Sequence, residues 1–284
     1  MDDTRLINPW VLGGDARYFW AVKKLRQDGL PVKTYGVPGL PNDAPDLKTA
    51  LSGADLLILP LMPFQDELLI IGEETYHGAL LPELAAKGAQ IIAGTIPDAL
   101  VDWYQRRGMQ CMTFLDLESY QMENAAVTAE GALELALRRL NQTIRGSKCL
   151  VIGWGRIGKF LAPKLRDMGA EVTVSARRSG HWAQLAGLGL RPERTGEYRH
   201  GLGGYDVIFN TVPKQIMTEE QLTSIPSECL LVELASEPGG FPEGRGDRVE
   251  TARGLPGKTA PKSAGEIVAA AVWACLGGEG RSME

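Results

Sequence analysis

The segment Cys149–Ser179, CLVIGWGRIGKFLAPKLRDMGAEVTVSARRS, determines the fold class. An apolar run leads into three glycines with the spacing Gly153-x-Gly155-x-x-Gly158, and an amphipathic stretch then leads into a second apolar run. Three glycines between a strand and a helix are typical of a turn that binds a dinucleotide. The first allows the tight turn, the second lets the backbone approach a pyrophosphate, and the third lets the helix pack closely on the strand. The segment therefore predicts a strand–helix–strand unit of a Rossmann-type domain.

The glycine turn also predicts where the phosphates of a dinucleotide would lie. A helix that begins at this turn presents unpaired N–H groups and the positive end of its dipole. We expect the phosphates to contact the turn and the first residues of the helix. The predicted contacts are Gly153, Gly155, Arg156, Ile157 and Gly158. The alternative, a glycine-rich turn without a ligand, stays open at this point.

The end of the second apolar run predicts which dinucleotide is bound. A site for NAD usually carries an Asp or Glu there, which binds the ribose hydroxyls. This sequence instead has Ser175, Arg177 and Arg178 and no acidic residue. A hydroxyl and two guanidinium groups suit a 2′-phosphate, so we expect NADP(H) rather than NAD(H). The alternative is that the two arginines belong to a solvated loop.

The rest of the chain alternates short apolar runs with amphipathic stretches, the pattern of repeated β-α units around parallel sheets. We predict an α/β protein with two Rossmann-like, doubly wound parallel-sheet domains joined by a long linker helix. The expected parts are an N-terminal substrate domain over 1–124, the linker helix over 125–145 and an NADP-binding domain over 146–264. A C-terminal helix at about 265–284 is expected to pack back on the first domain, with the site in the cleft between the domains.

Composition excludes several classes of protein. The 284 residues are 44% hydrophobic and 23% charged with a net charge of −5, which argues against a general nucleic-acid or membrane-surface role. Apolar runs are too short to span a membrane, and the N-terminus MDDTRLINPW does not resemble a signal peptide. The four cysteines are scattered, as expected of buried thiols in a reducing compartment. We therefore expect a cytoplasmic protein.

Six motifs occur in one order along almost the whole chain: GGDAR (Gly13–Arg17), TAEGAL (Thr128–Leu133), GWGRIGK (Gly153–Lys159), NTVP (Asn210–Pro213), LASEPGG (Leu234–Gly240) and GLPGKTAPKSAG (Gly254–Gly265). Together they resemble the A subunits of dipicolinate synthase from spore-forming bacteria. The glycine turn alone is common to many families. The pairing of LASEPGG with GLPGKTAPKSAG is much more specific.

The resemblance implies a function that composition and spacing do not show. It implies an NADP-dependent oxidoreductase in the mother cell of a sporulating bacterium, whose partner is a flavoprotein-like B subunit and which could also form a homo-oligomer. The implied reaction is loss of water and oxidation of a reduced, 4-hydroxylated tetrahydrodipicolinate of the lysine pathway, giving pyridine-2,6-dicarboxylate. Which of the two steps takes place on this chain stays open.

A dicarboxylate substrate directs attention to cations and helix N-termini. Gly14, Asp15 and Arg17 follow the first predicted strand, where a substrate would lie, although Asp15 could instead cap the helix. Lys262 and Ser263 stand at the start of the last helix, where Ser263 and Glu266 have the spacing of a capping box. Lys262 is the preferred carboxylate receptor, and Lys258 is the second choice.

Further candidates follow two strands of the second domain and begin the linker helix. Asn210 and Thr211, and Ser236 after the next strand, are expected to line the nicotinamide side of the cofactor. Glu237 could act as a base or be an exposed carboxylate. Thr128, expected at the start of the linker helix with Glu130, could bind substrate or cap that helix. The predicted catalytic residues are Lys262, Glu237 and Arg17.

The three histidines, His77, His181 and His200, are expected at the surface, although His181 follows the arginine loop and could instead stack near adenine. No cluster has the spacing of metal ligands. Their positions do not match the His/Glu/Arg arrangement of 2-hydroxy-acid dehydrogenases. Two alternatives to the main prediction stay open: a 2-hydroxy-acid or amino-acid dehydrogenase with the same layout, and a non-catalytic protein that binds NADP for a partner.

Overall fold

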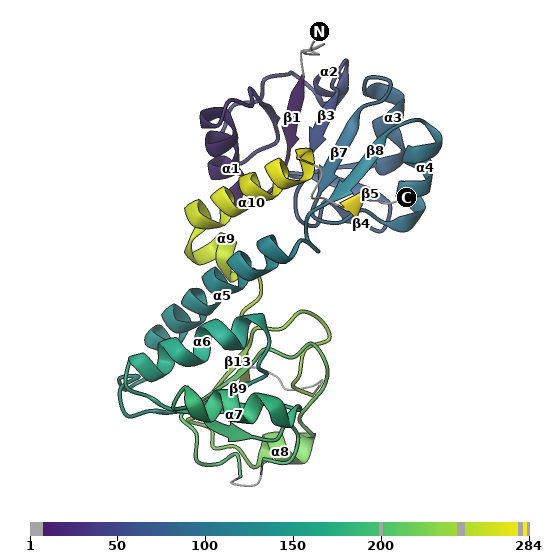
Figure 1. The fold of residues 1–284 in the computed structure, drawn as a ribbon. Coiled ribbons are helices and arrows are strands. Elements are labelled where there is room, and N and C mark those ends of the chain that lie inside the picture. Colours follow the sequence, from purple (N-terminus) through teal and green to yellow (C-terminus); the bar gives the residue numbers. More distant parts are fainter. Residues whose placement is uncertain (1–7, 199–200, 243–247, 278–280, 283–284) are drawn as a thin grey trace. The chain divides into compact units, whose positions relative to one another are not determined.

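The computed structural model describes residues 8–198, 201–242, 248–277 and 281–282. The chain divides into two compact units (Figure 1). Unit 1 holds the described part of 1–124 and of 260–284, and unit 2 holds Ala125–Thr259. Each unit is built on a mainly parallel six-stranded sheet with helices and apolar cores on both faces. The prediction of an α/β fold with two Rossmann-like, doubly wound sheets is confirmed.

The sheet of unit 1 has the order β15-β8-β7-β3-β1-β2. Its strands are β1 (Pro9–Leu12), β2 (Lys33–Tyr35), β3 (Leu56–Ile58), β7 (Gln90–Ala93), β8 (Gln110–Thr113) and β15 (Arg281–Ser282). The first five are parallel, and β15 pairs antiparallel with β8. Because β2 and β3 lie on opposite sides of β1, the chain reverses direction across the sheet between β1 and β3, where open parallel sheets bind ligands.

Helices cover both faces of this sheet. They are α1 (Ala16–Gln27), α2 (Leu47–Leu51), η1 (Gly78–Leu80), α3 (Leu81–Leu84), α4 (Asp98–Arg106) and α10 (Pro261–Leu276). One core, with buried residues from α1 and α10, lies on one face, and a second, with residues from α2, α3 and α4, lies on the other. The helix α10, yellow in Figure 1, packs directly on α1. A Cβ atom at Gly265 would lie 2.3 Å from the backbone oxygen of Arg17, so this close approach requires glycine.

The boundaries of the last helix differ from the prediction. The helix begins at Pro261 with Ala260 as its N-cap and no side-chain cap, so the predicted capping box of Ser263 and Glu266 is wrong. Proline suits the first helical position because its ring fixes φ and it has no N–H group to leave unpaired. The helix ends at Leu276 rather than near 284, and residues 281–282 form β15.

A small antiparallel sheet in unit 1 was not predicted. It consists of β4 (Phe64–Gln65), β5 (Leu68–Ile71) and β6 (Glu74–His77). In β5 the residues Leu69 and Ile71 are buried while Leu68 and Ile70 are exposed. Because both faces of the strand carry Leu or Ile, the strand lacks the apolar–polar alternation that predicts a half-buried strand.

The sheet of unit 2 has the order β11-β10-β9-β12-β13-β14 and is entirely parallel. Its strands are β9 (Lys148–Ile152), β10 (Glu171–Ser175), β11 (Arg191–Glu193), β12 (Val207–Asn210), β13 (Leu230–Glu233) and β14 (Val249–Thr251). Its helices are α6 (Arg156–Asp167), α7 (Ser179–Gly187), α8 (Glu219–Thr223) and α9 (Leu255–Thr259). In sequence order the strands lie as 3-2-1-4-5-6, the order of a dinucleotide-binding Rossmann fold.

The long helix α5 (Glu118–Arg139) begins earlier and ends earlier than the predicted linker helix over 125–145. Gly146, seven residues beyond the end of α5, has a φ of +81° and donates its N–H to the oxygen of Gly169. Thr128 and Glu130 lie inside α5, so the prediction that they begin the helix and cap it is wrong.

All four cysteines are buried and unpaired, and burial raises the pKa of each thiol, as for Cys149, whose pKa rises to about 12. They therefore stay protonated near neutral pH. Within the residues that the structure describes, no helix combines the length and the apolar character needed to cross a membrane.

Candidate functional site

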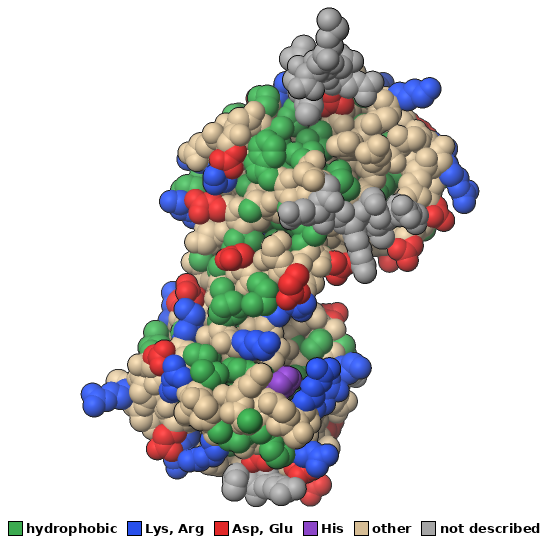
Figure 2. All heavy atoms as spheres, viewed as in Figure 1, with side chains coloured by type: hydrophobic (Ala, Val, Ile, Leu, Met, Phe, Trp, Pro, Cys, Tyr) green, Lys and Arg blue, Asp and Glu red, His purple; other side chains and the backbone are tan. Residues whose placement is uncertain are grey.

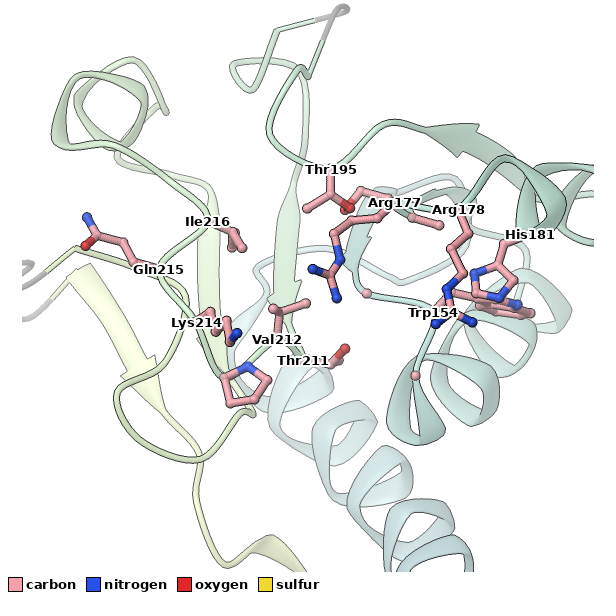
Figure 3. A pocket seen from close by; sticks show the side chains of 15 residues that line it. Trp154, Arg177, Arg178, His181, Thr195, Thr211, Val212, Lys214, Gln215 and Ile216 are labelled. Atoms are coloured by element: carbon pink, nitrogen blue, oxygen red, sulfur yellow. The ribbon is translucent and has the colours of Figure 1, made fainter.

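A cavity of about 530 Å³ opens at the carboxyl ends of β9, β10 and β12 in unit 2 (Figure 3). It lies where the strand order reverses, between β9 and β12, the position at which Rossmann folds bind nucleotides. The lining residues come from the end of strand β10, the segments that follow β9, β10, β11 and β12, and helix α7. They are Gly153, Trp154, Gly155, Ser175, Ala176, Arg177, Arg178, His181, Thr195, Thr211, Val212, Pro213, Lys214, Gln215 and Ile216.

The glycine turn has the geometry of a phosphate site. Gly153 has a φ of +107°, and a Cβ atom there would lie 2.4 Å from the hydroxyl of Thr211. A Cβ atom at Gly158 would lie 2.1 Å from the oxygen of Gly153, so only glycine lets α6 approach the turn this closely. Gly155 is the N-cap of α6, has no side chain to bond the first N–H groups, and has open space where a side chain would lie. These N–H groups are therefore available to an anion.

The lining residues carry positive charge. Arg177, Arg178 and Lys214 contribute three cations, and the lining residues include no Asp or Glu. In Figure 3, Arg177 extends into the cavity from the loop after β10 and Lys214 extends from the loop after β12. Figure 2 shows Lys and Arg side chains around a histidine on the viewed face of unit 2. The cavity is therefore suited to an anionic ligand.

The loop after β10 holds the predicted 2′-phosphate contacts. Ser175 is fully buried, and its hydroxyl lies 3.2 Å from the hydroxyl of Thr195. Arg177 and Arg178 are exposed side chains at the rim of the cavity. Figure 3 shows Arg178 beside His181 and Trp154. The cavity thus brings together six predicted cofactor residues: Gly153, Gly155, Ser175, Arg177, Arg178 and Thr211.

Several lining residues were not predicted. Trp154 lies between two of the glycines and is 9% exposed, and Lys214 directly follows the motif NTVP. His181 was expected at the surface but is half-buried in the wall of the cavity. Lys214 could have been found from its place after a motif assigned to the cofactor. His181 follows the arginine loop, which gave it a possible place near adenine. Thr195 follows no such motif, and only the fold brings it to the cavity.

Five predicted cofactor residues do not line the cavity: Arg156, Ile157, Gly158, Asn210 and Ser236. Asn210 is fully buried, and its side-chain amide is used within the protein. Its Nδ2 donates to Glu233 Oε1 at 2.6 Å and to the oxygen of Val212 at 2.9 Å, while its Oδ1 accepts from the N–H of Val212. Asn210 therefore shapes the loop that carries Thr211 and Lys214.

Glu233 organises the neighbouring loop from the same interior position. Its buried carboxylate also accepts from the N–H groups of Ala235 at 3.0 Å and Gly240 at 2.8 Å. Ser236 and Glu237 lie in the loop that this carboxylate holds, and both are exposed. Glu237 forms an ion pair with Arg253 at 2.6 Å and is 83% exposed at its side chain. Its role as a base stays a prediction.

Asp15 and Arg17, predicted substrate residues, lie at the first turn of α1. Asp15 is the N-cap of α1, and its carboxylate accepts the N–H of Arg17 at 3.1 Å. The interpretation of Asp15 as a helix cap is therefore confirmed. Arg17 is 8% exposed, and its Nε donates to both carboxylate oxygens of Asp15 at 2.8 and 3.0 Å. Gly14, with a φ of +108°, makes the turn that places them at the carboxyl end of β1.

The other predicted substrate residues belong to three helices. Lys262 and Ser263 are exposed in the first turn of α10, with the Lys262 Nζ 5.8 Å from the centre of the Trp20 ring. Thr128 is buried inside α5. Lys258, the second choice, is exposed in α9. Their substrate contacts stay predictions.

The remaining predictions concern metal ligands, His77 and His200. Among the described residues, no group of three or more His, Cys, Asp or Glu side chains is placed to hold a metal ion. His77 is exposed and lies 3.7 Å from Glu67. His200 lies outside the described residues.

Comparisons with known proteins agree with this architecture. A family model for the N-terminal domain of the dipicolinate synthase A subunit matches residues 10–115. The dipicolinate synthase A subunit of Bacillus subtilis is 30% identical, covering 91% of this chain and 92% of its own. The crystal structure of the dipicolinate synthase A subunit from Bacillus halodurans has a TM-score of 0.81 at 27% identity, over 95% of this chain and 97% of that chain.

A more distant structure shares the fold alone. Transhydrogenase from Sinorhizobium meliloti matches with a TM-score of 0.70 at 18% identity, over 96% of this chain and 94% of that chain. The fold of this chain is thus shared with a transhydrogenase. The identity and coverage of the Bacillus subtilis relative are specific, and they show that this chain belongs to the family of dipicolinate synthase A subunits.

Proposed function

We propose that this chain is an NADP-dependent oxidoreductase that serves as the A subunit of a dipicolinate synthase. It would convert a reduced, 4-hydroxylated tetrahydrodipicolinate into pyridine-2,6-dicarboxylate in the mother cell of a sporulating bacterium. Its proposed partner is a flavoprotein-like B subunit. Family membership supports the substrate class and the partner. The cavity in unit 2 supports the cofactor.

One observation carries the cofactor assignment. The cavity combines an uncapped helix N-terminus at Gly155 with two guanidinium groups after β10, and its lining residues include no carboxylate. The helix N-terminus suits the pyrophosphate. Arg177 and Arg178 stand where a dinucleotide site binds the adenosine ribose, and their charges suit a 2′-phosphate.

The residues around the cavity fit the two halves of the dinucleotide. Ser175, Arg177 and Arg178 would hold the adenosine half, and Thr211 and Lys214 the nicotinamide half. The buried Asn210–Glu233 pair would keep the loops after β12 and β13 in place. When bound, the nicotinamide would supply a hydride acceptor. The ring must first lose its hydroxyl and a neighbouring hydrogen as water, and then a hydride and a proton.

The cofactor assignment is tested by titrating NADPH and NADH onto the wild-type chain and the Arg177→Ala, Arg178→Ala double variant. We expect the wild type to bind NADPH at least about tenfold more tightly, because each charged hydrogen bond to the 2′-phosphate contributes roughly 1.5–3 kcal/mol. The double variant should lose this preference and keep its affinity for NADH.

The matched control removes two cations elsewhere. Lys87 and Arg106 are exposed in unit 1 and far along the chain from the cavity. The Lys87→Ala, Arg106→Ala variant should retain the preference for NADPH. Equal affinity of the wild type for both cofactors would contradict the assignment.

A second candidate, a non-catalytic protein that binds NADP, is favoured by the lack of an acid–base pair among the residues that line the cavity. Of these residues only His181 is a histidine, and none is an Asp or Glu. The two functions are separated by supplying the reduced precursor and NADP⁺ to the chain with and without its partner. Formation of pyridine dicarboxylate together with NADPH supports the enzyme, and cofactor binding without turnover in any combination supports the non-catalytic protein.

A further inference from the structure

The side chain of Tyr120, in the first turn of α5, is buried without a hydrogen-bond partner. It is 3% exposed, and its hydroxyl forms no hydrogen bond within the described residues. Leaving a buried hydroxyl unpaired costs about 1–3 kcal/mol. Proteins rarely keep such a group, so its presence calls for a ligand or another functional reason.

Two charged groups lie near this hydroxyl, the guanidinium of Arg17 and the carboxylate of Asp15 that pairs with it. Burial raises the pKa of Tyr120 to about 12, and the positive charge of Arg17 opposes that effect. The guanidinium approaches the hydroxyl without completing a hydrogen bond to it, and the protonated hydroxyl keeps its own hydrogen to donate near neutral pH. Of the guanidinium nitrogens, only Nε is used by Asp15. The two terminal nitrogens make no hydrogen bond with the described residues, so Arg17 keeps donors available.

The surrounding structure holds both side chains in place. The Tyr120 ring packs edge-on against Phe114, with ring centres 5.2 Å apart. Arg17 is fixed by Asp15 and by the packing of α10 against its backbone at Gly265. Arg17 follows the end of β1, at the edge where the strand order of unit 1 reverses. Two donors of fixed position thus lie at the edge where a parallel sheet binds ligands.

We propose that the Tyr120 hydroxyl and the Arg17 guanidinium together form a receptor for one carboxylate of the substrate. An unpaired O–H donor beside a cation is satisfied by an anionic oxygen, and a carboxylate can accept from both groups. The inference rests on the proposed function for the identity of the anion, a ring dicarboxylate. It adds Tyr120, which no sequence motif indicated.

A tyrosine with a purely structural role should lose stability, and not ligand affinity, when its hydroxyl is removed. A buried hydroxyl that contributes to folding makes a hydrogen bond, as Tyr104 does when it donates to the oxygen of Gly78 at 2.9 Å. Removing the Tyr120 hydroxyl removes an unpaired polar group, so Tyr120→Phe should keep or raise the melting temperature. The ring and its contact with Phe114 remain. A loss of ligand affinity in a fully stable variant cannot come from misfolding.

The test compares Tyr120→Phe with the matched variant Tyr104→Phe in the full chain. Pyridine-2,6-dicarboxylate is titrated calorimetrically onto each protein, and thermal unfolding and NADPH affinity are measured in parallel. We expect Tyr120→Phe to bind the dicarboxylate at least about tenfold more weakly, the loss of one hydrogen bond to a charged group. Its melting temperature should be unchanged or higher. Tyr104→Phe should melt about 2–4 °C lower and bind the dicarboxylate normally.

Each other outcome overturns the proposal. Equal affinity of wild type and Tyr120→Phe removes Tyr120 from the receptor and leaves the proposed function intact. A lower melting temperature of Tyr120→Phe, with weaker binding of both ligands, assigns it a structural role. If the wild type binds NADPH but no dicarboxylate, the proposed substrate class fails and this receptor fails with it.

Discussion

The two units contain the same turn with different chemistry. In unit 1, β1 ends at Leu12 and the N-cap of α1 is Asp15, and in unit 2, β9 ends at Ile152 and the N-cap of α6 is Gly155. Both N-caps follow their strand by three residues. Their backbones are alike, with φ and ψ of −108° and −168° at Asp15 and of −86° and −162° at Gly155. The glycine after each strand has positive φ.

The side chains decide what each turn can bind. In unit 1 the carboxylate of Asp15 occupies the helix N-terminus, and Tyr18 stands at the position that Gly158 has in unit 2. In unit 2 the N-cap has no side chain, and Gly158 brings the helix against the turn. Unit 1 has therefore filled with a carboxylate the place at the helix N-terminus that unit 2 leaves open. The comparison teaches that the fold supplies the position of a ligand and the N-cap residue decides its charge.

The largest effect is expected from Gly158→Ala. The added methyl group would lie 2.1 Å from the oxygen of Gly153, so the helix must move away from the turn. We expect a loss of about 3 kcal/mol in the stability of unit 2, at the upper end for overpacking, and loss of NADPH binding. Urea denaturation and NADPH titration measure the two effects.

Gly155→Ala is the control for this variant, since open space surrounds that position. It should stay as stable as the wild type. A Gly158→Ala variant with normal stability would show that α6 need not approach the turn this closely for unit 2 to be stable.

The next effect comes from moving the cap of unit 1 into unit 2 with Gly155→Asp. The similar backbone angles allow Asp to cap α6 as Asp15 caps α1, so stability should change by only a few tenths of a kcal/mol. NADPH affinity should fall about 100-fold, equivalent to about 2.8 kcal/mol, because the carboxylate both occupies the N–H groups and repels the phosphates.

Gly155→Asn separates these two causes, since it caps the helix without a charge. Its affinity for NADPH should lie between those of the wild type and Gly155→Asp. Normal affinity of Gly155→Asp would mean that the phosphates do not lie at this helix, and the comparison between the units would fail.

The sequence predicted those features of both turns that depend on residues close together in the chain, namely the strands and the helix cap. The strands around the turns are continuous apolar runs, and the cap at Asp15 is a local preference, so both followed from short segments. The start of α10 was predicted wrongly because Ser263 and Glu266 suggested a cap while Pro261 sets the first turn. Two sequence patterns thus indicate different first residues for α10, and the one that begins the helix at Pro261 is the one found in the folded chain, where α10 packs on α1.

Contacts between distant segments could not be predicted in the same way. His181 and Thr195 reach the cavity because β10 pairs with β9 and β11 pairs with β10. Asn210 was predicted to face the cofactor, yet its register opposite Glu233 on β13 turns its amide to the interior. Tyr120 lies more than one hundred residues from Arg17 in the chain, so the pair depends on the folded sheet.

The smallest effect is expected at the turn of unit 1, where Asp15 caps α1. Asp15→Ala removes the cap of α1, and we expect a loss of about 1 kcal/mol in stability, measured by urea denaturation. Asp15→Asn keeps a side-chain oxygen for the N–H of Arg17 and should recover most of that loss. Neither variant should change NADPH affinity, because the α1 turn has Tyr18 where a phosphate-binding turn needs glycine. If Asp15→Ala weakened NADPH binding while Asp15→Asn did not, the cap of α1 would matter to the cofactor, and the division of roles between the two turns would be wrong.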